Sequence, residues 1–317
     1  MKLRIVYPLI LLNLVLISAC TFWPLTRGST PDSPSAGNTP DTPGGNLATP
    51  ADQSGSPTLQ ATHTVNLPLL ANAGQQEGDW QLIPRETESV DENLNVRFRV
   101  TAPEMQGDGG DAASNFNQAV EQLVQNETNV GEAAGGEPIQ DPGGFLLLGY
   151  QVTSSSGWEG FEPYAMAEDN PGTLSAEQVV LDGGHRVIGI VFEIVSYFGG
   201  AHPVSYHHEL NFDLSAARVL SLEDLFEPGS DYLDVIAGYS IDELSKNREI
   251  LFEDFEQYAA PAPENYSVWT ITPGGLLIVF EEYQVAPYAA GPQYVVVPYS
   301  ELAGMLDPEG PLGNLAQ

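Results

Sequence analysis

The stretch Val187–Tyr197 reads VIGIVFEIVSY and is the most apolar run after the N-terminal segment. Near-continuous hydrophobicity over this length is typical of a β-strand that is covered on both faces. We therefore expect this run to be the central strand of a sheet. Gly199 and Gly200 follow it and predict a turn into the next extended segment, 202–213.

Shorter patterned segments surround the central strand. Strict alternation over 95–100, NVRFRV, predicts a half-buried strand. Apolar residues recur on one face over 115–125, and Ser114 before them predicts an N-cap and a helix. The other predicted strands are 145–153, 268–272, 276–280 and 293–297, and the other predicted helices are 230–246 and 299–305. Strands and helices mix without a repeating βαβ order, which favours the α+β class.

Charge and composition exclude several classes of protein. The 317 residues include 43 Asp and Glu against 10 Lys and Arg, which gives a net charge of −33. Such a charge repels nucleic-acid phosphates and disfavours adsorption to anionic lipid. Hydrophobic residues make up 42% of the chain, enough for a folded core. We therefore expect an acidic, folded protein that does not bind nucleic acid.

The N-terminus has the pattern of a bacterial lipoprotein signal. Lys2 and Arg4 precede an apolar run that is too short to be a comfortable membrane span. The run ends in ISAC, which resembles the lipobox, and its Cys20 is the only cysteine in the chain. We expect 1–19 to be a signal peptide and Cys20 to carry the lipid on the extracytoplasmic face of the cell membrane. An ordinary signal peptide or an uncleaved anchor is the alternative.

Composition also divides the rest of the chain. Residues 20–78 are rich in Ser, Thr, Pro and Gly and predict a disordered tether with an end-to-end distance of about 40–45 Å. We expect an N-terminal α+β lobe over 79–183, a C-terminal lobe over 184–306 and a tail over 307–317.

Residues 199–209, GGAHPVSYHHE, gather three histidines and a glutamate and so suggest a metal site. Neighbours on a strand point to opposite faces, which separates His207 from His208. His202 and His208 share a face but lie about 20 Å apart in an extended strand, too far for one ion. We therefore predict no metal, a half-buried and hydrogen-bonded His208, and His207 and Glu209 in solvent.

No other pattern indicates catalysis or a cofactor. The chain has no Gly-x-Ser-x-Gly elbow, no P-loop and no dinucleotide-binding glycine pattern. Adjacent carboxylates such as Glu281 and Glu282 are expected by chance among so many acids, and solvated acidic surface is their ordinary interpretation. We predict no catalytic residue and no cofactor.

Residues 282–292, EYQVAPYAAGP, have the composition of a recognition loop. Tyrosines and prolines between two strands make a stiff loop that offers large contact surfaces. Tyr283 and Tyr288 are therefore candidate partner contacts, together with Gly199, Gly200 and His202. The alternative is that both tyrosines only cover the edge of the core.

Four motifs, in this order and spacing, resemble the extracytoplasmic domain family shared by the anti-sigma factor RsiV and the peptidoglycan deacetylase PdaC. They are YFGGAH at 197–202, LNFDL with LSLEDLF at 210–226, VAPYAAGP at 285–292 and VPYSEL at 297–302. The resemblance is specific over 184–306 and holds only in outline over 80–182.

The resemblance implies an α+β fold of two lobes, the second similar to a small piece of the Hsp70 ATPase fold without its nucleotide site. It also implies an extracytoplasmic binding role, since the RsiV domain captures lysozyme. Anti-sigma activity needs a cytoplasmic segment and a transmembrane helix, and PdaC catalysis belongs to a separate domain. We therefore expect neither activity from this chain.

Three hypotheses follow from the sequence. The first is a non-enzymatic surface lipoprotein whose folded part binds a cationic protein such as lysozyme. The second is a cell-wall glycan hydrolase or deacetylase that uses acidic residues or the His202 region. The third attributes the acid excess to a saline habitat, in which case the charge carries no information about a partner.

Overall fold

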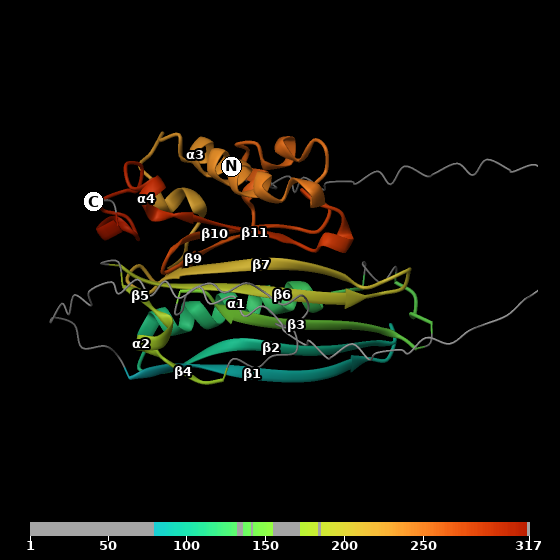
Figure 1. Cartoon of the computed structure of the whole chain (residues 1–317). Coiled ribbons are helices and arrows are strands. Elements are labelled where there is room, and N and C mark those ends of the chain that lie inside the picture. The colour runs from blue at the N-terminus through green and yellow to red at the C-terminus, as the bar shows by residue number, and fades with distance from the viewer. Residues whose placement is uncertain (1–78, 132–135, 141, 155–171, 183–184, 316–317) are drawn as a thin grey trace, which may run out of the picture. The chain divides into compact units, whose positions relative to one another are not determined.

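Two β-sheets, one lying on a face of the other, organise the residues that the structure describes (Figure 1). The computed structural model describes residues 79–131, 136–140, 142–154, 172–182 and 185–315. The predicted signal peptide, the lipid-bearing Cys20 and the predicted tether lie outside these ranges.

The larger sheet has the strand order β4-β1-β2-β3-β6-β7-β8, and β5 pairs with β6 beside this path. Its strands are β1 (Trp80–Asp91), β2 (Val96–Gly107), β3 (Gly144–Val152), β4 (Leu174–Ser175), β5 (Leu181–Asp182), β6 (Arg186–Tyr197), β7 (Val204–Asp213) and β8 (Arg218–Val219). Every residue of β6 from Val187 to Ser196 is buried, so the prediction of a central strand covered on both faces is confirmed.

The only parallel pair among the described strands is β2 and β3, because helix α1 (Gly110–Thr128) crosses over between them. The helix begins five residues before the predicted start, so the prediction of Ser114 as its N-cap is wrong. Gly107 and Gly110 both have positive φ, and they turn the chain straight from β2 into the helix. The predicted buried face is confirmed at Phe116 and Val120.

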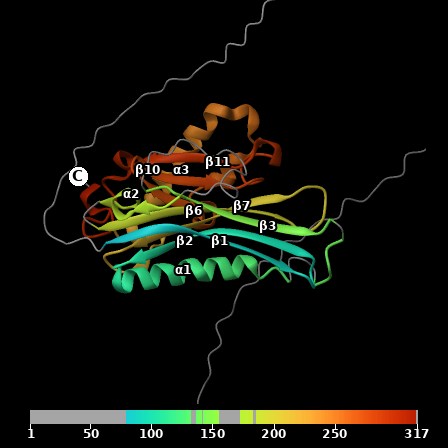
Figure 2. The ribbon, with the colours of Figure 1, turned by 90° about the horizontal axis from the view of Figure 1, so that it is seen from below.

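Helix α1 covers one face of the larger sheet, and the three-stranded sheet with helix α3 (Tyr232–Leu244) lies on the other side (Figure 2). The first core lies under α1, where Phe116 meets Phe212 of β7 edge to face at 5.5 Å. The even-numbered residues of β6 supply its centre: Ile188, Ile190, Phe192 and Ile194.

The smaller sheet has the order β11-β10-β9 and is antiparallel throughout. Its strands are β9 (Trp269–Thr272), β10 (Gly275–Phe280) and β11 (Gln293–Pro298), followed by helix α4 (Tyr299–Leu302). These predicted strands and the predicted helices near 230 and 299 are confirmed. The second core lies between this sheet and α3, and it includes fully buried Leu312 from the segment predicted as a tail. The short helix α2 (Ala176–Val179) and several 3-10 turns are the remaining elements of the described residues.

Polar side chains and one glycine join the two sheets. Asn211 of β7 is completely buried, and its side chain accepts bonds from the Ile271 N–H at 3.0 Å and the Thr270 hydroxyl at 3.1 Å. Its amide donates to the Trp269 carbonyl at 3.0 Å. A Cβ on Gly189 of β6 would lie 2.6 Å from the Ile271 carbonyl oxygen, so only glycine permits this approach.

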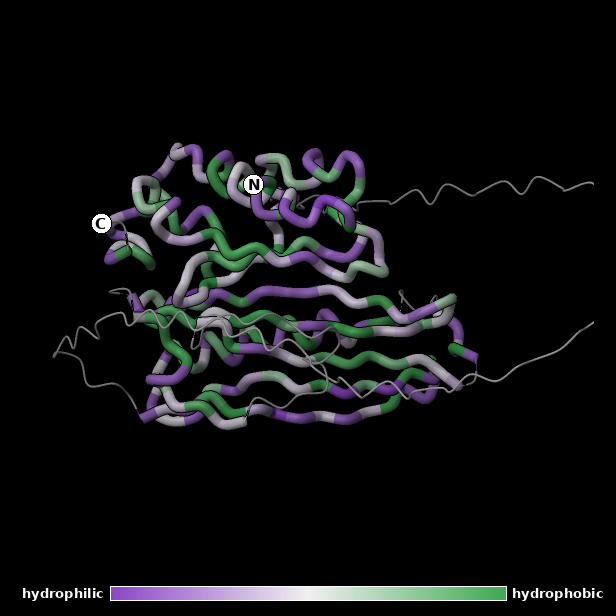
Figure 3. The backbone as a smooth tube through the Cα atoms, in the orientation of Figure 1, coloured by the Kyte–Doolittle hydropathy of each residue, from purple (hydrophilic) through white to green (hydrophobic). Residues whose placement is uncertain are grey.

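The lobe boundary predicted at 183/184 falls inside the larger sheet. Strand β3 precedes this boundary and β6 follows it, yet the two strands are paired. No strand is predicted over 80–91, whereas the structure has β1 there. Strand β1 is largely hydrophilic, whereas hydrophobic residues concentrate in strands nearer the middle of the sheet (Figure 3). A hydrophilic strand has no apolar pattern from which it could be predicted. None of the helices in the described ranges combines the length and the apolar character that a bilayer crossing requires.

Candidate functional site

His202, Tyr288 and Tyr283 form a partly exposed stack of three rings, which we call the aromatic platform. The centroids of His202 and Tyr288 lie 4.1 Å apart with planes inclined by 31°, and those of Tyr288 and Tyr283 lie 5.8 Å apart at 27°. His202 belongs to the turn before β7, whereas both tyrosines belong to the β10–β11 loop. The structure thus brings together the two segments that the sequence predicted as partner contacts.

The two candidate glycines shape the turn that carries His202. Gly199 and Gly200 have φ of +106° and +110°, which residues with a side chain rarely adopt. The Tyr197 hydroxyl donates to the Gly200 carbonyl at 3.1 Å, and the Tyr288 hydroxyl donates to the Pro203 carbonyl at 3.1 Å. The glycines therefore position the platform, and their lack of side chains leaves them only backbone groups for direct contact.

Two carboxylates fasten the β10–β11 loop to β7 behind the platform. Glu281 accepts a hydrogen bond from the backbone N–H of His207 at 2.7 Å, and its second oxygen lies 3.1 Å from His207 Nδ1. Glu282 accepts from the Ser205 hydroxyl at 2.9 Å. These charge-assisted bonds hold the loop, and with it both tyrosines, in one position.

Tyr283 occupies a backbone conformation that non-glycine residues avoid. Its φ is +67°, and its side chain is among the most exposed large ones, with 58% of the residue surface accessible. Gln284 closes the turn, because its side-chain oxygen accepts from Glu281 N–H and its amide donates to the Asn265 carbonyl, both at 3.0 Å. Such strain persists only where surrounding bonds enforce it, and it is commonest at functional sites.

The carboxyls around the loop are electrostatically crowded. Burial raises the pKa of Glu282, and the nearby Glu281 raises it further. Burial also raises the pKa of Glu209 to about 7. The pKa of the Tyr294 hydroxyl is raised by burial and by Glu193, Glu281 and Glu282, so that group stays neutral. A cation arriving beside Glu282 would offset this crowding.

His207 is buried, with only 3% of its surface accessible, so the prediction that it lies in solvent is wrong. Glu209, predicted with it, is half-buried. The physical reason is that the odd-numbered face of β7 lies under the smaller sheet and the β10–β11 loop, which supply partners such as Glu281. Alternation reveals which residues share a face but not whether a polar face meets water or other polar groups.

His208 is half-buried and hydrogen-bonded, as predicted. Its Nε2 lies 3.0 Å from Glu127 at the end of α1, and the Tyr206 hydroxyl donates to the same carboxylate at 2.6 Å. Glu127 raises the pKa of His208 above its ordinary value. Burial raises the pKa of Glu127, but the bonds from His208 and Tyr206 outweigh burial and hold that pKa below its usual range.

Replacing His208 with Gln should therefore lower stability in a defined pH window. Because the pKa of His208 is raised in the folded state, the interaction stabilises the fold fully below about pH 6.5. This stabilisation is lost as the pH rises through the folded-state pKa of His208. Because the pKa of Glu127 is lowered in the folded state, its bonds stabilise the fold fully above about pH 4.5. This stabilisation is lost as the pH falls through the folded-state pKa of Glu127. Urea unfolding should show the largest difference between wild type and variant from about pH 4.5 to 6.5, at or below about 1 kcal/mol because solvent screens the His208 side chain, which is 42% exposed. A difference independent of pH would contradict the ion pair.

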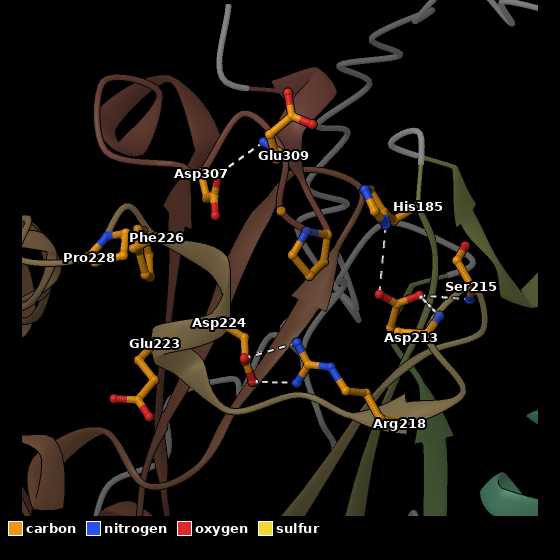
Figure 4. A pocket seen from close by; sticks show the side chains of 13 residues that line it. His185, Asp213, Ser215, Arg218, Glu223, Asp224, Phe226, Pro228, Asp307 and Glu309 are labelled. Atoms are coloured by element: carbon orange, nitrogen blue, oxygen red, sulfur yellow. Dashed lines mark hydrogen bonds and ion pairs between the residues drawn. The ribbon is translucent and has the colours of Figure 1, made fainter.

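A second candidate site, a pocket of about 460 Å³, lies between the β7–β8 turn and the segment 307–311 (Figure 4). Its lining includes five carboxylates: Asp213, Glu223, Asp224, Asp307 and Glu309. Arg218 donates two bonds of 2.9 Å to Asp224 and lowers the pKa of that carboxyl to about 2. Asp213 is buried and accepts from the N–H groups of Ser215 and Ala216, while His185 Nδ1 lies 3.8 Å from it.

Sequence reasoning missed this pocket because its lining comes from several segments between 185 and 311, with no local motif. None of the five predicted contact residues lines it. Within the described ranges, no three His, Cys, Asp or Glu side chains are grouped so that they could hold a metal ion. His202, His207 and His208 have different neighbours, namely Tyr288, Glu281 and Glu127.

One region of the chain matches a known protein family, and longer stretches of it resemble known proteins. Residues 223–300 match the family described as a protein of unknown function, DUF3298. The peptidoglycan-N-acetylmuramic acid deacetylase PdaC of Bacillus subtilis is 30% identical over 135 residues, which are 42% of this chain and 29% of that protein. An esterase of Mycobacterium tuberculosis is 23% identical over 172 residues, 52% of this chain and 74% of that protein. The chain thus spans less than a third of the length of the deacetylase.

Among solved structures, a DUF3298 family member from Bacteroides fragilis is similar at 15% sequence identity. The similarity covers 75% of this chain and 97% of that one, with a TM-score of 0.47.

Proposed function

We propose, from the match of residues 223–300 to the DUF3298 family and the similarity to the deacetylase PdaC, that the chain is a surface lipoprotein with a non-catalytic binding domain. The partner that best suits it is a cationic extracellular protein, lysozyme being the first to test. Similarity of the C-terminal lobe to part of the Hsp70 ATPase fold stays a prediction and carries no step of this proposal.

The aromatic platform is the observation that carries the proposal. Two segments far apart in the sequence meet in one partly exposed stack, and each is fixed from behind by hydrogen bonds to β7 or its turn. Tyrosine and histidine rings supply contact area at a low cost in conformational entropy. A surface that is already ordered before binding loses less free energy on association than a flexible one.

Charge supports a cationic partner. The net charge of −33 attracts a basic protein over several ångströms and raises the rate of encounter, an effect that salt screens. Anchoring through Cys20 would suit such a chain, because acyl chains insert by burial of CH₂ groups and need no basic patch. Cys20 lies outside the described residues, and the mass of the mature N-terminal peptide tests this part of the proposal.

Calorimetric titration of the full chain with lysozyme tests the binding proposal. We expect a saturable complex whose dissociation constant rises about tenfold or more between 50 and 300 mM salt, because the long-range attraction is screened. Absence of a complex at both salt concentrations would remove lysozyme as the partner. A free energy of unfolding that increases strongly with salt concentration, without any complex with lysozyme, would favour the saline-habitat hypothesis.

The carboxylate pocket favours a second candidate function, hydrolysis or deacetylation of a cell-wall glycan. Several carboxyls gathered in one cavity are the groups that general acid–base catalysis uses, and PdaC acts on peptidoglycan by name. Peptidoglycan turnover measured with and without a chelator, for wild type and Asp213→Asn, separates the two functions. Turnover abolished by Asp213→Asn would replace the binding proposal with the enzymatic one.

A further inference from the structure

We infer that Tyr283 and Glu282 together form the seat for an arginine side chain of the partner, with the guanidinium lying on the outer face of the Tyr283 ring. This inference rests on the proposed function and narrows it from a cationic protein to one contact group. It identifies Tyr283 as the terminal ring of the platform and Glu282 as the carboxylate that pairs with the bound cation.

The stack leaves one ring free to receive a ligand. Tyr288 lies between His202 and Tyr283 and is close to both rings, whereas Tyr283 is the last member and keeps 58% of its surface accessible. A tyrosine face carries negative electrostatic potential, which attracts a cation placed within about 6 Å of the ring centroid. The hydrogen bonds of Gln284 fix the turn that carries Tyr283 before the partner arrives.

A carboxylate lies within reach of the same position. Glu282 contacts Ser205 of β7, and Tyr288 contacts Pro203, two residues earlier on the same extended segment. Two residues of extended chain span about 7 Å, so the points at which Glu282 and Tyr288 are anchored to this segment lie about that far apart.

Several observations favour arginine over the other groups that bind tyrosine. A guanidinium is planar, stacks on aromatic rings and pairs with carboxylates through two parallel bonds, while the lysine ammonium is compact and strongly hydrated. A cation beside Glu282 would also offset the crowding of this carboxyl by Glu281. Sugar rings stack on tyrosines too, and their hydroxyls can donate to carboxylates, but they carry no charge to offset the repulsion between Glu281 and Glu282.

Two peptides of equal charge, hexa-arginine and hexa-lysine, test the inference by titration into the full chain. We expect wild type to bind hexa-arginine about fivefold more tightly. Tyr283→Leu should reduce the difference to within about twofold, while Tyr283→Phe, which keeps both the ring and the strained backbone, should preserve it. Glu282→Gln should weaken hexa-arginine binding about tenfold, and Glu256→Gln, an exposed site of the same charge change, by less than about twofold.

Failure of this inference can be told from failure of the proposed function. Lysozyme binding that Tyr283→Leu leaves unchanged would keep the binding proposal and overturn the arginine seat. Preferential hexa-arginine binding without any lysozyme complex would keep the seat and reject that partner. Equal affinity for the two peptides in wild type, or displacement of hexa-arginine by oligomers of N-acetylglucosamine, would overturn the seat. Melting temperatures of all variants show whether each is folded.

Discussion

Asn211→Ala is expected to lower the free energy of unfolding by about 4 kcal/mol, because it removes a buried side chain that joins the two sheets. The Asn211 side chain is fully buried and bonds to three groups of β9, namely the Ile271 N–H, the Thr270 hydroxyl and the Trp269 carbonyl. Alanine would leave a buried donor and a buried acceptor of the backbone without these partners, at about 1–3 kcal/mol each, and would add a small cavity.

Urea unfolding measures this effect, and Asn115→Ala is the matched control. Asn115 also donates one side-chain bond to a backbone carbonyl, that of Ala217, but at an exposed position. Its loss should cost less than about 1 kcal/mol, because water replaces the bond. If Asn211→Ala changed stability no more than Asn115→Ala, the two sheets would not be joined through this side chain.

Glu281→Ala should reduce stability and partner binding together. The Glu281 carboxylate is the acceptor for the backbone N–H of buried His207, and its second oxygen lies beside the imidazole. Removing it leaves the N–H without this acceptor, and we expect a loss of about 2–3 kcal/mol, in the range for hydrogen bonds to charged groups. Because Glu281 adjoins Glu282 and Tyr283, the β10–β11 loop should lose its fixed position.

The conservative variant separates anchoring from charge. Glu281→Gln retains an oxygen that accepts from the His207 N–H, so it should recover at least half of the lost stability and most of the lysozyme affinity. Hydrogen exchange of residues 281–292 should be faster in Glu281→Ala than in Glu281→Gln. A loop equally protected in both variants, with unchanged affinity, would show that Glu281 does not position the platform.

How far the sequence predicts the fold depends on what covers each element. Val187–Tyr197 is apolar on both faces, so its central place in the sheet is visible in the sequence alone. β1 carries mostly exposed polar residues and gives no such signal. The start of α1 is set by glycines whose left-handed conformation competes with Ser114 as a cap. The polar face of β7 at His207 is buried by a loop that lies far along the sequence.

The candidate site was predictable in its parts and not in its assembly. The composition of 282–292 and the glycines before His202 mark two contact segments, and both contribute to the platform. Their meeting depends on bonds such as Glu282 to Ser205, which no local pattern encodes. No sequence pattern predicts the carboxylate pocket, because each segment that lines it contributes only one or a few of its charged residues.

The central claim is that the aromatic platform is the surface that binds a cationic partner. The most direct test is the dissociation constant for lysozyme at low salt, compared between wild type and Tyr288→Ala, the ring that touches both other members of the stack. We predict a loss of about tenfold or more in affinity while the melting temperature changes little. Equal affinity of the two proteins would contradict the claim and place the binding surface elsewhere on the chain.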